Sequence, residues 1–137
     1  MNIKVIKVSP DELPKVIEID NGLEAMQEQV GGMIQYIMPF EDEIALVCNE
    51  EGKILGLDLN RAITMHNEEL GHDEMVDIIA GDFILCYAPY DSEDFLSIPD
   101  ELIDKYKNMF KKGHDFYYDL DNKLTFSEYD IEKEIEL

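Results

Sequence analysis

The sequence predicts an α+β domain with a mostly antiparallel sheet and two main helices packed on one face. Short apolar segments with strand-like character recur along the chain, and clusters of glycine, proline and acidic residues separate them. Only two segments show a helical period. The resulting order of elements, β-β-α-β-β-β-β-α, is typical of an α+β architecture.

The first part of the chain supplies two strands, a helix and a third strand. Residues 3–8 predict a strand, 9–12 a turn, and 15–19 the returning strand. A short helix is expected over 23–30, because its apolar residues share one face. Its apolar face consists of Leu23, Met26 and Val30. Asp20 or Asn21 is the candidate N-cap, and Gly31 and Gly32 are expected to end the helix. Residues 33–38 are again strand-like.

The middle of the chain predicts a hairpin and two further strands. Residues 44–48 and 53–57 are expected to pair across a turn that contains Gly52. Residues 64–75 are polar and predict an exposed loop. Residues 75–79 and 82–88 are apolar, which indicates two strands or one strand with a bulge at Gly81.

The second helix follows a loop over residues 89–94. Ser97 is a candidate cap, Pro99 suits the first turn, and Gly113 is expected to close the helix. Its apolar stripe consists of Ile98, Leu102, Ile103, Tyr106, Met109 and Phe110. We therefore expect one domain over residues 1–112. Residues 113–137 form an acidic, aromatic extension, which predicts either a further strand near 123–129 that completes the core or a tail that docks a partner.

Composition narrows the classes of partner. The 137 residues suit a single core, and the net charge of −21 is spread along the chain. Such charge disfavours direct binding to nucleic acid or an anionic membrane, and it favours basic protein surfaces. No apolar run approaches a membrane span and no signal peptide is evident, so a cytoplasmic location is expected. Cys48 and Cys86 lie in apolar runs and predict buried, reduced thiols.

Arg61 is the only arginine of the chain, and Asn60 precedes it. A guanidinium offers a rigid fork for carboxylate or phosphate, so one interpretation is a site for a small anion such as a nucleotide. In that interpretation the backbone amides of Gly56 and Gly81 would assist, and subunits of an oligomer would combine their sites. The other interpretation is structural: Arg61 pairs with a carboxylate, and Asn60 forms an Asx-type turn.

The sequence offers little support for catalysis. His66, His72 and His114 lack metal-ligand spacing and are expected to be solvated loop residues, so neither a metal nor a cofactor is predicted. Among so many carboxylates, adjacent acidic pairs are expected without any function. The serines lack the context of a catalytic triad, and no phosphate-binding glycine motif occurs. We therefore expect a protein that is not an enzyme.

Three motifs together carry a resemblance to a known family. They are Asn49-Glu50-Glu51-Gly52-Lys53, Asn60-Arg61-Ala62, and Ile78-Ile79-Ala80-Gly81 followed after one residue by Phe83. The chain resembles, over about residues 2–112, a family of small domains of unknown function that are encoded largely by phages, plasmids and other mobile elements. That resemblance implies a role in mobile-element biology and supplies no catalytic residue.

Charge and resemblance together lead to three functional hypotheses. The first is a non-enzymatic inhibitor that binds a basic host-defence protein or nuclease complex by imitating the charge of nucleic acid. The second is an oligomeric module that sequesters a nucleotide signal at Asn60 and Arg61, and the third is a regulator of the mobile element. The acids expected to contact a basic partner are Glu41, Asp42, Glu43, Glu50, Glu51, Asp91, Glu93 and Asp94.

Overall fold

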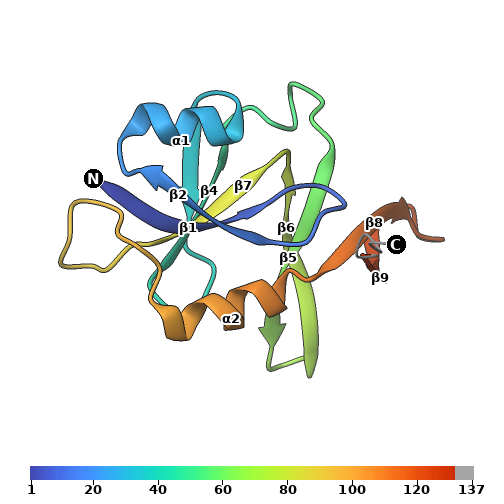
Figure 1. The fold of residues 1–137 in the computed structure, drawn as a ribbon. Coiled ribbons are helices and arrows are strands. Elements are labelled where there is room, and N and C mark those ends of the chain that lie inside the picture. Colours follow the sequence, from blue (N-terminus) through green and yellow to red (C-terminus); the bar gives the residue numbers. More distant parts are fainter. Residues whose placement is uncertain (132–137) are drawn as a thin grey trace, which may run out of the picture.

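A five-stranded antiparallel sheet in the strand order β2-β1-β7-β4-β3 forms the centre of the molecule (Figure 1). The computed structural model describes residues 1–131, so residues 132–137 of the predicted extension lie outside the described part. The sheet and its two helices contain β1 (Asn2–Val8), β2 (Lys15–Asp20), α1 (Leu23–Val30), β3 (Ile34–Ile37), β4 (Ile44–Asn49), β7 (Phe83–Tyr87) and α2 (Asp100–Met109). Two separate hairpins complete the fold: β5 (Leu59–Asn67) with β6 (His72–Ala80), and β8 (Lys112–Tyr118) with β9 (Leu124–Asp130). The predicted α+β class with mostly antiparallel pairing is confirmed.

The two helices lie on opposite faces of the central sheet, so the prediction that both pack on one face is wrong. Met26 of α1 packs in a cluster with Val47 and Ile84. Tyr106 of α2 packs in a second cluster with Leu46 and Phe83, and therefore on the other side of the same two strands. The reason is visible in β4, whose six residues are all buried. A strand that is apolar without alternation is buried on both faces and needs a cover on each.

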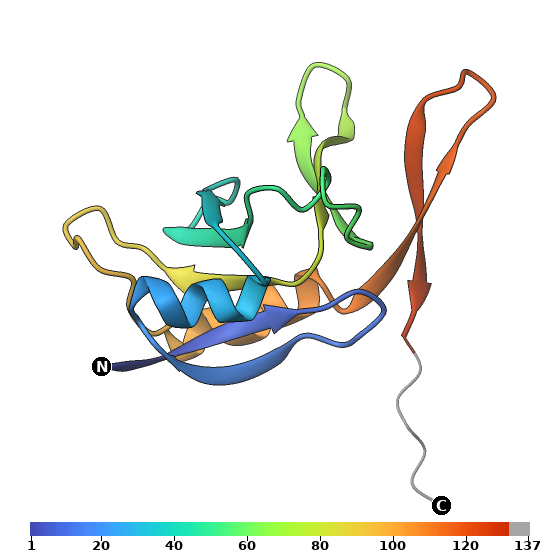
Figure 2. The ribbon, with the colours of Figure 1, turned by 90° about the horizontal axis from the view of Figure 1, so that it is seen from above.

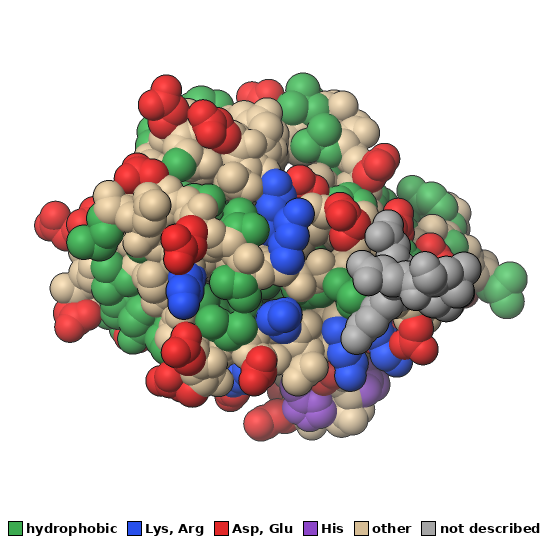
Figure 3. All heavy atoms as spheres, in the orientation of Figure 1, with side chains coloured by type: hydrophobic (Ala, Val, Ile, Leu, Met, Phe, Trp, Pro, Cys, Tyr) green, Lys and Arg blue, Asp and Glu red, His purple; other side chains and the backbone are tan. Residues whose placement is uncertain are grey.

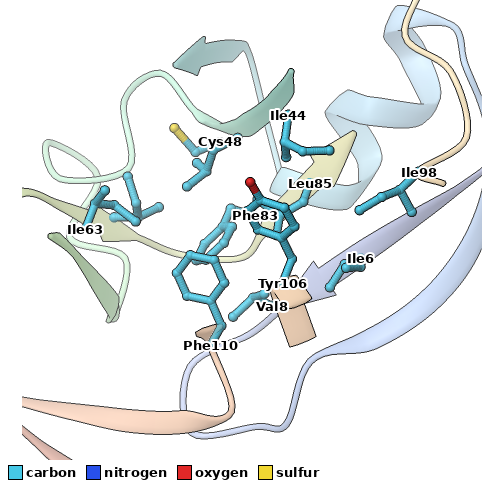
Figure 4. Close-up of a cluster of buried hydrophobic side chains, with 12 residues drawn as sticks. Ile6, Val8, Ile44, Cys48, Ile63, Phe83, Leu85, Ile98, Tyr106 and Phe110 are labelled. Carbon is cyan, nitrogen blue, oxygen red and sulfur yellow. The ribbon is translucent and has the colours of Figure 1, made fainter. Parts of the chain in front are cut away.

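Aromatic rings fill the α2 side of the core (Figure 4). The ring of Phe110 meets that of Phe83 edge to face at 5.3 Å, and the ring of Phe40 meets that of Tyr106 at 5.1 Å. Such geometry adds a favourable electrostatic contribution to the burial of apolar area. Both cysteines are buried, as predicted, and burial raises the pKa of the Cys86 thiol to about 12.

The predicted hairpin of residues 44–48 with 53–57 does not form. Strand β4 instead pairs with β7 and β3, and residues 50–56 form consecutive turns. Gly52 explains part of this path, because an added Cβ there would lie 2.7 Å from the carbonyl oxygen of Ala80. The chain thus passes directly against the end of β6, where only glycine fits.

The segment over residues 64–75, predicted to be an exposed loop, is most of the β5–β6 hairpin. Register pairs run from Thr64 with Met75 to Asn67 with His72, and Gly71 closes the turn with a φ of +71°. Its polarity reflects projection from the body into solvent, which leaves both faces of the outer hairpin wet. Gly81 is a turn between β6 and β7 in two different sheets, with a φ of +81°.

Both helices begin without the predicted side-chain caps. Gly22 occupies the N-cap of α1, and Asp20 accepts the Gly22 N–H from two residues away. Pro99 occupies the N-cap of α2, and the Ser97 hydroxyl oxygen accepts the N–H of Lys4 at 2.9 Å instead. The helix α2 ends at Met109, and Gly113 lies inside β8 rather than at a helix end. Neither helix of the described residues is long and apolar enough to cross a bilayer.

The strand expected near residues 123–129 is present as β9, and its partner is β8. The β8–β9 hairpin stands beside the body and projects to the same side as the tip of the β5–β6 hairpin (Figure 2). It is anchored to the body near its base, where the Tyr129 hydroxyl donates to Asp11 of the β1–β2 turn. Burial is the main cause that raises the pKa of Tyr129 to about 12, and this hydrogen bond is the second cause.

Candidate functional site

Asn60 and Arg61 sit at an irregularity of β5, where the pairing with β6 shifts in register between Leu59 and Arg61. The Asn60 amide nitrogen donates to the carbonyl oxygens of Val8 and Gly81, each at 2.9 Å. Its amide oxygen accepts from Arg61 Nη1 at 2.8 Å. Asn60 therefore joins β1, the β6–β7 turn and the guanidinium in one buried network.

The guanidinium of Arg61 is buried, with 0% of the residue exposed, and backbone carbonyls surround it. Its Nη2 donates to the carbonyl oxygens of Glu12 at 2.8 Å and Phe110 at 3.1 Å. Its Nε also donates to Phe110, and Nη1 also reaches Ser9. Burial lowers the pKa of Arg61, while Tyr129 and Asp11 oppose that shift. We call this arrangement the Arg61 clasp, because it holds the β1–β2 turn, β5 and the end of α2 together.

The clasp corrects the expectation that Arg61 offers its guanidinium to an anion. All its nitrogens donate to protein oxygens, and the partners are neutral carbonyls rather than the carboxylate of the structural interpretation. The two glycines expected to assist are also engaged. The Gly81 amide donates to Asp58 at 2.7 Å, and the Gly56 amide donates to Lys53 at 3.2 Å in an exposed turn. The residues named for a nucleotide site therefore have structural partners.

His114 has a specific role in β8, whereas the sequence predicted a solvated loop residue. Its Nδ1 accepts the backbone N–H of Ala62 at 2.9 Å, which requires the tautomer protonated on Nε2. Its ring stacks on Phe126 at a centroid distance of 4.5 Å. Burial is the main cause that lowers the pKa of His114, and the nearby positive charge of Arg61 is the second. The negative charge of Glu128 opposes the shift. His66 and His72 are exposed strand residues, and His66 bonds to Asp73 at 3.0 Å.

The bond from Ala62 to His114 predicts acid sensitivity. A histidine held neutral in the fold, with a pKa below its ordinary 6.5, stabilises the folded state fully above that pH. The contribution falls as pH drops through the lower folded pKa, because protonation removes the acceptor. We expect the free energy of unfolding of the parent to decline below about pH 6.5 relative to that of His114→Asn, whose amide oxygen accepts without titrating. Parallel pH profiles for the two proteins, from urea denaturation, would contradict this role.

The eight acids predicted to contact a partner fall into two groups at opposite ends of β4. Glu50 and Glu51 follow the strand, and the Glu50 amide donates to Met33. The other six come from the β3–β4 loop and the β7–α2 loop, and they lie close together because the Ala88 amide donates to the Glu43 carbonyl at 2.8 Å. We call this second group the acidic end: Glu41, Asp42, Glu43, Asp91, Glu93 and Asp94.

Two exposed tyrosines, which no sequence pattern indicated as functional, accompany the acidic end. Tyr36 of β3 is 56% exposed and Tyr90 of the β7–α2 loop is 86% exposed. Together with Met38, Glu93 and Phe95 they line a hollow of about 260 Å³. The Tyr36 ring contacts that of Phe95 edge to face at 5.5 Å, which fixes its position. The alternation of side chains along β3 would have assigned Tyr36 to one face of that strand. Its proximity to Tyr90 depends on the order of strands in the central sheet, which the sequence does not reveal.

Not every carboxylate of the acidic end is free. Asp42 accepts from Lys105 Nζ at 2.6 Å and from the Tyr106 hydroxyl at 2.8 Å, and these bonds lower the pKa of Asp42 in that order of importance. Lys105 also bonds to Glu41. Asp42 therefore fixes the β3–β4 loop on α2, while Glu43, Asp91, Glu93 and Asp94 have no ionic partner within residues 1–131.

Neither a metal-holding cluster nor a cysteine with a lowered pKa occurs within residues 1–131. In that part of the chain no group of three histidine, cysteine, aspartate or glutamate side chains is placed to hold a metal ion. Burial raises the pKa of both thiols, which disfavours the reactive thiolate.

Comparison with known proteins identifies a family without a described activity. Neither a curated protein nor a solved structure matches the chain. A family model does match, and it covers residues 3–111, which include the central sheet, both helices and the Arg61 clasp. The β8–β9 hairpin begins where that match ends. The chain belongs to the family described as Domain of unknown function (DUF3846).

Proposed function

We propose that this protein is a non-enzymatic inhibitor encoded by a phage or another mobile element. It binds a basic, nucleic-acid-handling protein of host defence, and the acidic end is the contact surface. The observation that carries this proposal is the combination of unpaired carboxylates with two exposed tyrosines around one hollow. Tyrosines anchor protein interfaces, while carboxylates steer basic partners and set the register of docking.

The charge of the whole chain supports a basic partner. Acidic side chains spread over the face seen in Figure 3, and lysines are few. Several lysines are already paired within the protein, such as Lys7 with Asp82 and Lys53 with Asp77. The only arginine is buried in the clasp. With 32 aspartates and glutamates against 11 lysines and arginines, the net charge is −21, and such a charge repels nucleic acid itself.

Capture from host lysate with a matched pair of variants tests the proposal. The first variant reverses Asp91, Glu93 and Asp94 to lysine, and the control reverses Glu68, Glu69 and Asp121 to lysine at the two hairpin tips. Both variants have the same net charge. We expect the parent and the control to retain a basic nucleic-acid-binding protein, which a salt step or added DNA releases, and the acidic-end variant to lose roughly tenfold in affinity.

Two outcomes would count against this function. Equal capture by both variants would mean that net charge, rather than the acidic end, determines binding. An affinity for the captured protein that stays constant from low to high salt would exclude recognition by charge. Binding by Tyr36→Ser and Tyr90→Ser proteins then measures how much the exposed rings contribute.

A further inference from the structure

One edge of β5 is not paired with another strand within residues 1–131, although His114 of β8 lies beside it at Ala62. In the part of the chain that the structure describes, β5 pairs only with β6. Alternate N–H and C=O groups of such a strand point away from its partner and can pair with another extended chain. The N–H of Ala62 shows which side is open, because it donates to the side chain of His114.

The open edge continues from Ala62 toward the hairpin tip. After Ile63 the register between β5 and β6 shifts by one residue, and the unpaired residue, Val76, belongs to β6. The backbone groups of β5 therefore continue to alternate between its two edges without interruption. The backbone groups of Thr64 and His66 therefore point to the same side as those of Ala62. Both residues are exposed, unlike Ala62 and Ile63.

A groove runs along this edge, between β5 and the C-terminal end of α2, with β8 and β9 beyond. It consists of two hollows, about 560 Å³ and about 70 Å³, that share Phe40, Thr64 and Met109. Figure 1 shows the end of α2 beside the β5–β6 hairpin, with β8 leaving from that end. We call this region the β5 groove.

Apolar side chains contribute to the lining of both hollows of the β5 groove, beside polar and charged ones. Met65 is 50% exposed and Met109 is 47% exposed, and both line the larger hollow. Phe126 lines the smaller hollow beside His114. Methionine and aromatic side chains adapt to varied side chains, so the groove suits apolar residues of an added strand.

Charge around the β5 groove selects a basic occupant. Glu41 and Asp73 border the larger hollow and Glu128 borders the smaller one. Lys105 also lines the larger hollow, and its ammonium group donates hydrogen bonds to Glu41 and Asp42. A second copy of this chain would bring further negative charge to the same rim, which disfavours self-association there.

From the open edge, the apolar side chains of the lining and the acidic rim, we infer that the β5 groove binds an extended, basic segment of a partner protein. The segment adds a strand to β5 through backbone hydrogen bonds at Thr64 and His66. Its apolar side chains enter the groove and its lysines or arginines meet Glu41, Asp73 and Glu128. The β5 groove shares Glu41 with the acidic end, but Asp91, Glu93 and Asp94, which the lysate test reverses, do not line it.

A synthetic peptide, acetyl-Lys-Val-Lys-Val-Lys-Val-Lys-Val-amide, tests the groove directly. Backbone amide NMR of the full chain should show saturable shifts at Thr64, Met65 and His66. Two further peptides carry N-methyl groups on all valine amides or on all lysine amides, and each therefore blocks one edge of the strand. We expect one of them to bind like the parent peptide and the other to bind roughly tenfold more weakly. Equal affinities for the two blocked peptides, or shifts centred on residues 90–94, would overturn strand addition.

Matched variants of the β8–β9 hairpin complete the test. Glu128→Lys reverses a charge at the rim, and Asp121→Lys reverses one at the exposed hairpin tip. We expect a several-fold loss of peptide affinity in Glu128→Lys and an unchanged affinity in Asp121→Lys. The same loss in both would mean that the peptide senses only net charge. These results are independent of lysate capture, so either proposal can fail alone.

Discussion

Replacing Arg61 with methionine is expected to lower the free energy of unfolding by about 2–5 kcal/mol, because at least two carbonyl acceptors lose their donor at about 1–3 kcal/mol each. The variant fills similar space but leaves the carbonyl oxygens of Glu12 and Phe110 without their donor. Buried acceptors without partners account for most of the cost. Urea denaturation at neutral pH measures this change in the free energy of unfolding. The dependence of that free energy on urea concentration should stay the same if the denatured state is unaffected.

The control for Arg61→Met is Lys111→Met, which removes one positive charge from an exposed residue beside the clasp. Exposed charges contribute little, so that variant should stay within about 0.5 kcal/mol of the parent. If Arg61→Met proved as stable as Lys111→Met, the clasp would not hold the three segments together, and a ligand role for Arg61 would need to be considered again.

Truncating Tyr106 to alanine should cost about 3–5 kcal/mol, as is typical when a large buried aromatic side chain is lost. Tyr106 is 0% exposed, and its ring packs against Phe40. Tyr106→Phe keeps the ring and removes only the hydrogen bond to Asp42, so a loss of about 1 kcal/mol is expected. Thermal or urea unfolding of both variants separates packing from hydrogen bonding. Equal losses in both would mean that the hydroxyl, and not the ring, dominates.

Local sequence patterns predicted the elements that depend on local chemistry. Strands β1 and β2, helix α1 and strand β7 follow from apolar spacing and turn residues within a few positions. The hairpin of residues 44–48 with 53–57 was wrong because a turn signal does not reveal that two distant strands, β3 and β7, compete for both edges of β4. The unbroken apolar run of β4 was the available sign of burial on both faces.

The candidate site was less predictable, since its contacts join residues far apart in the sequence. The isolation of Arg61 in the composition marked it for attention, but its partners are backbone carbonyls, which leave no trace in the sequence. His114 likewise meets a backbone N–H fifty-two positions away. The grouping of six predicted acids with Tyr36 and Tyr90 required the order of strands in the sheet. Whether these acids contact a partner stays a prediction.

The order of strands also governs when the chain can fold during synthesis. Strand β1 is the second strand of the central sheet, and Ile6 pairs with Leu85 of β7. A growing chain that has not yet produced β7 can form the β1–β2 hairpin but leaves the other edge of β1 exposed and apolar. Pairing over such a long separation is slow, because the loop must close before its contacts stabilise it. The high negative charge of the chain opposes association of such early intermediates until the sheet closes.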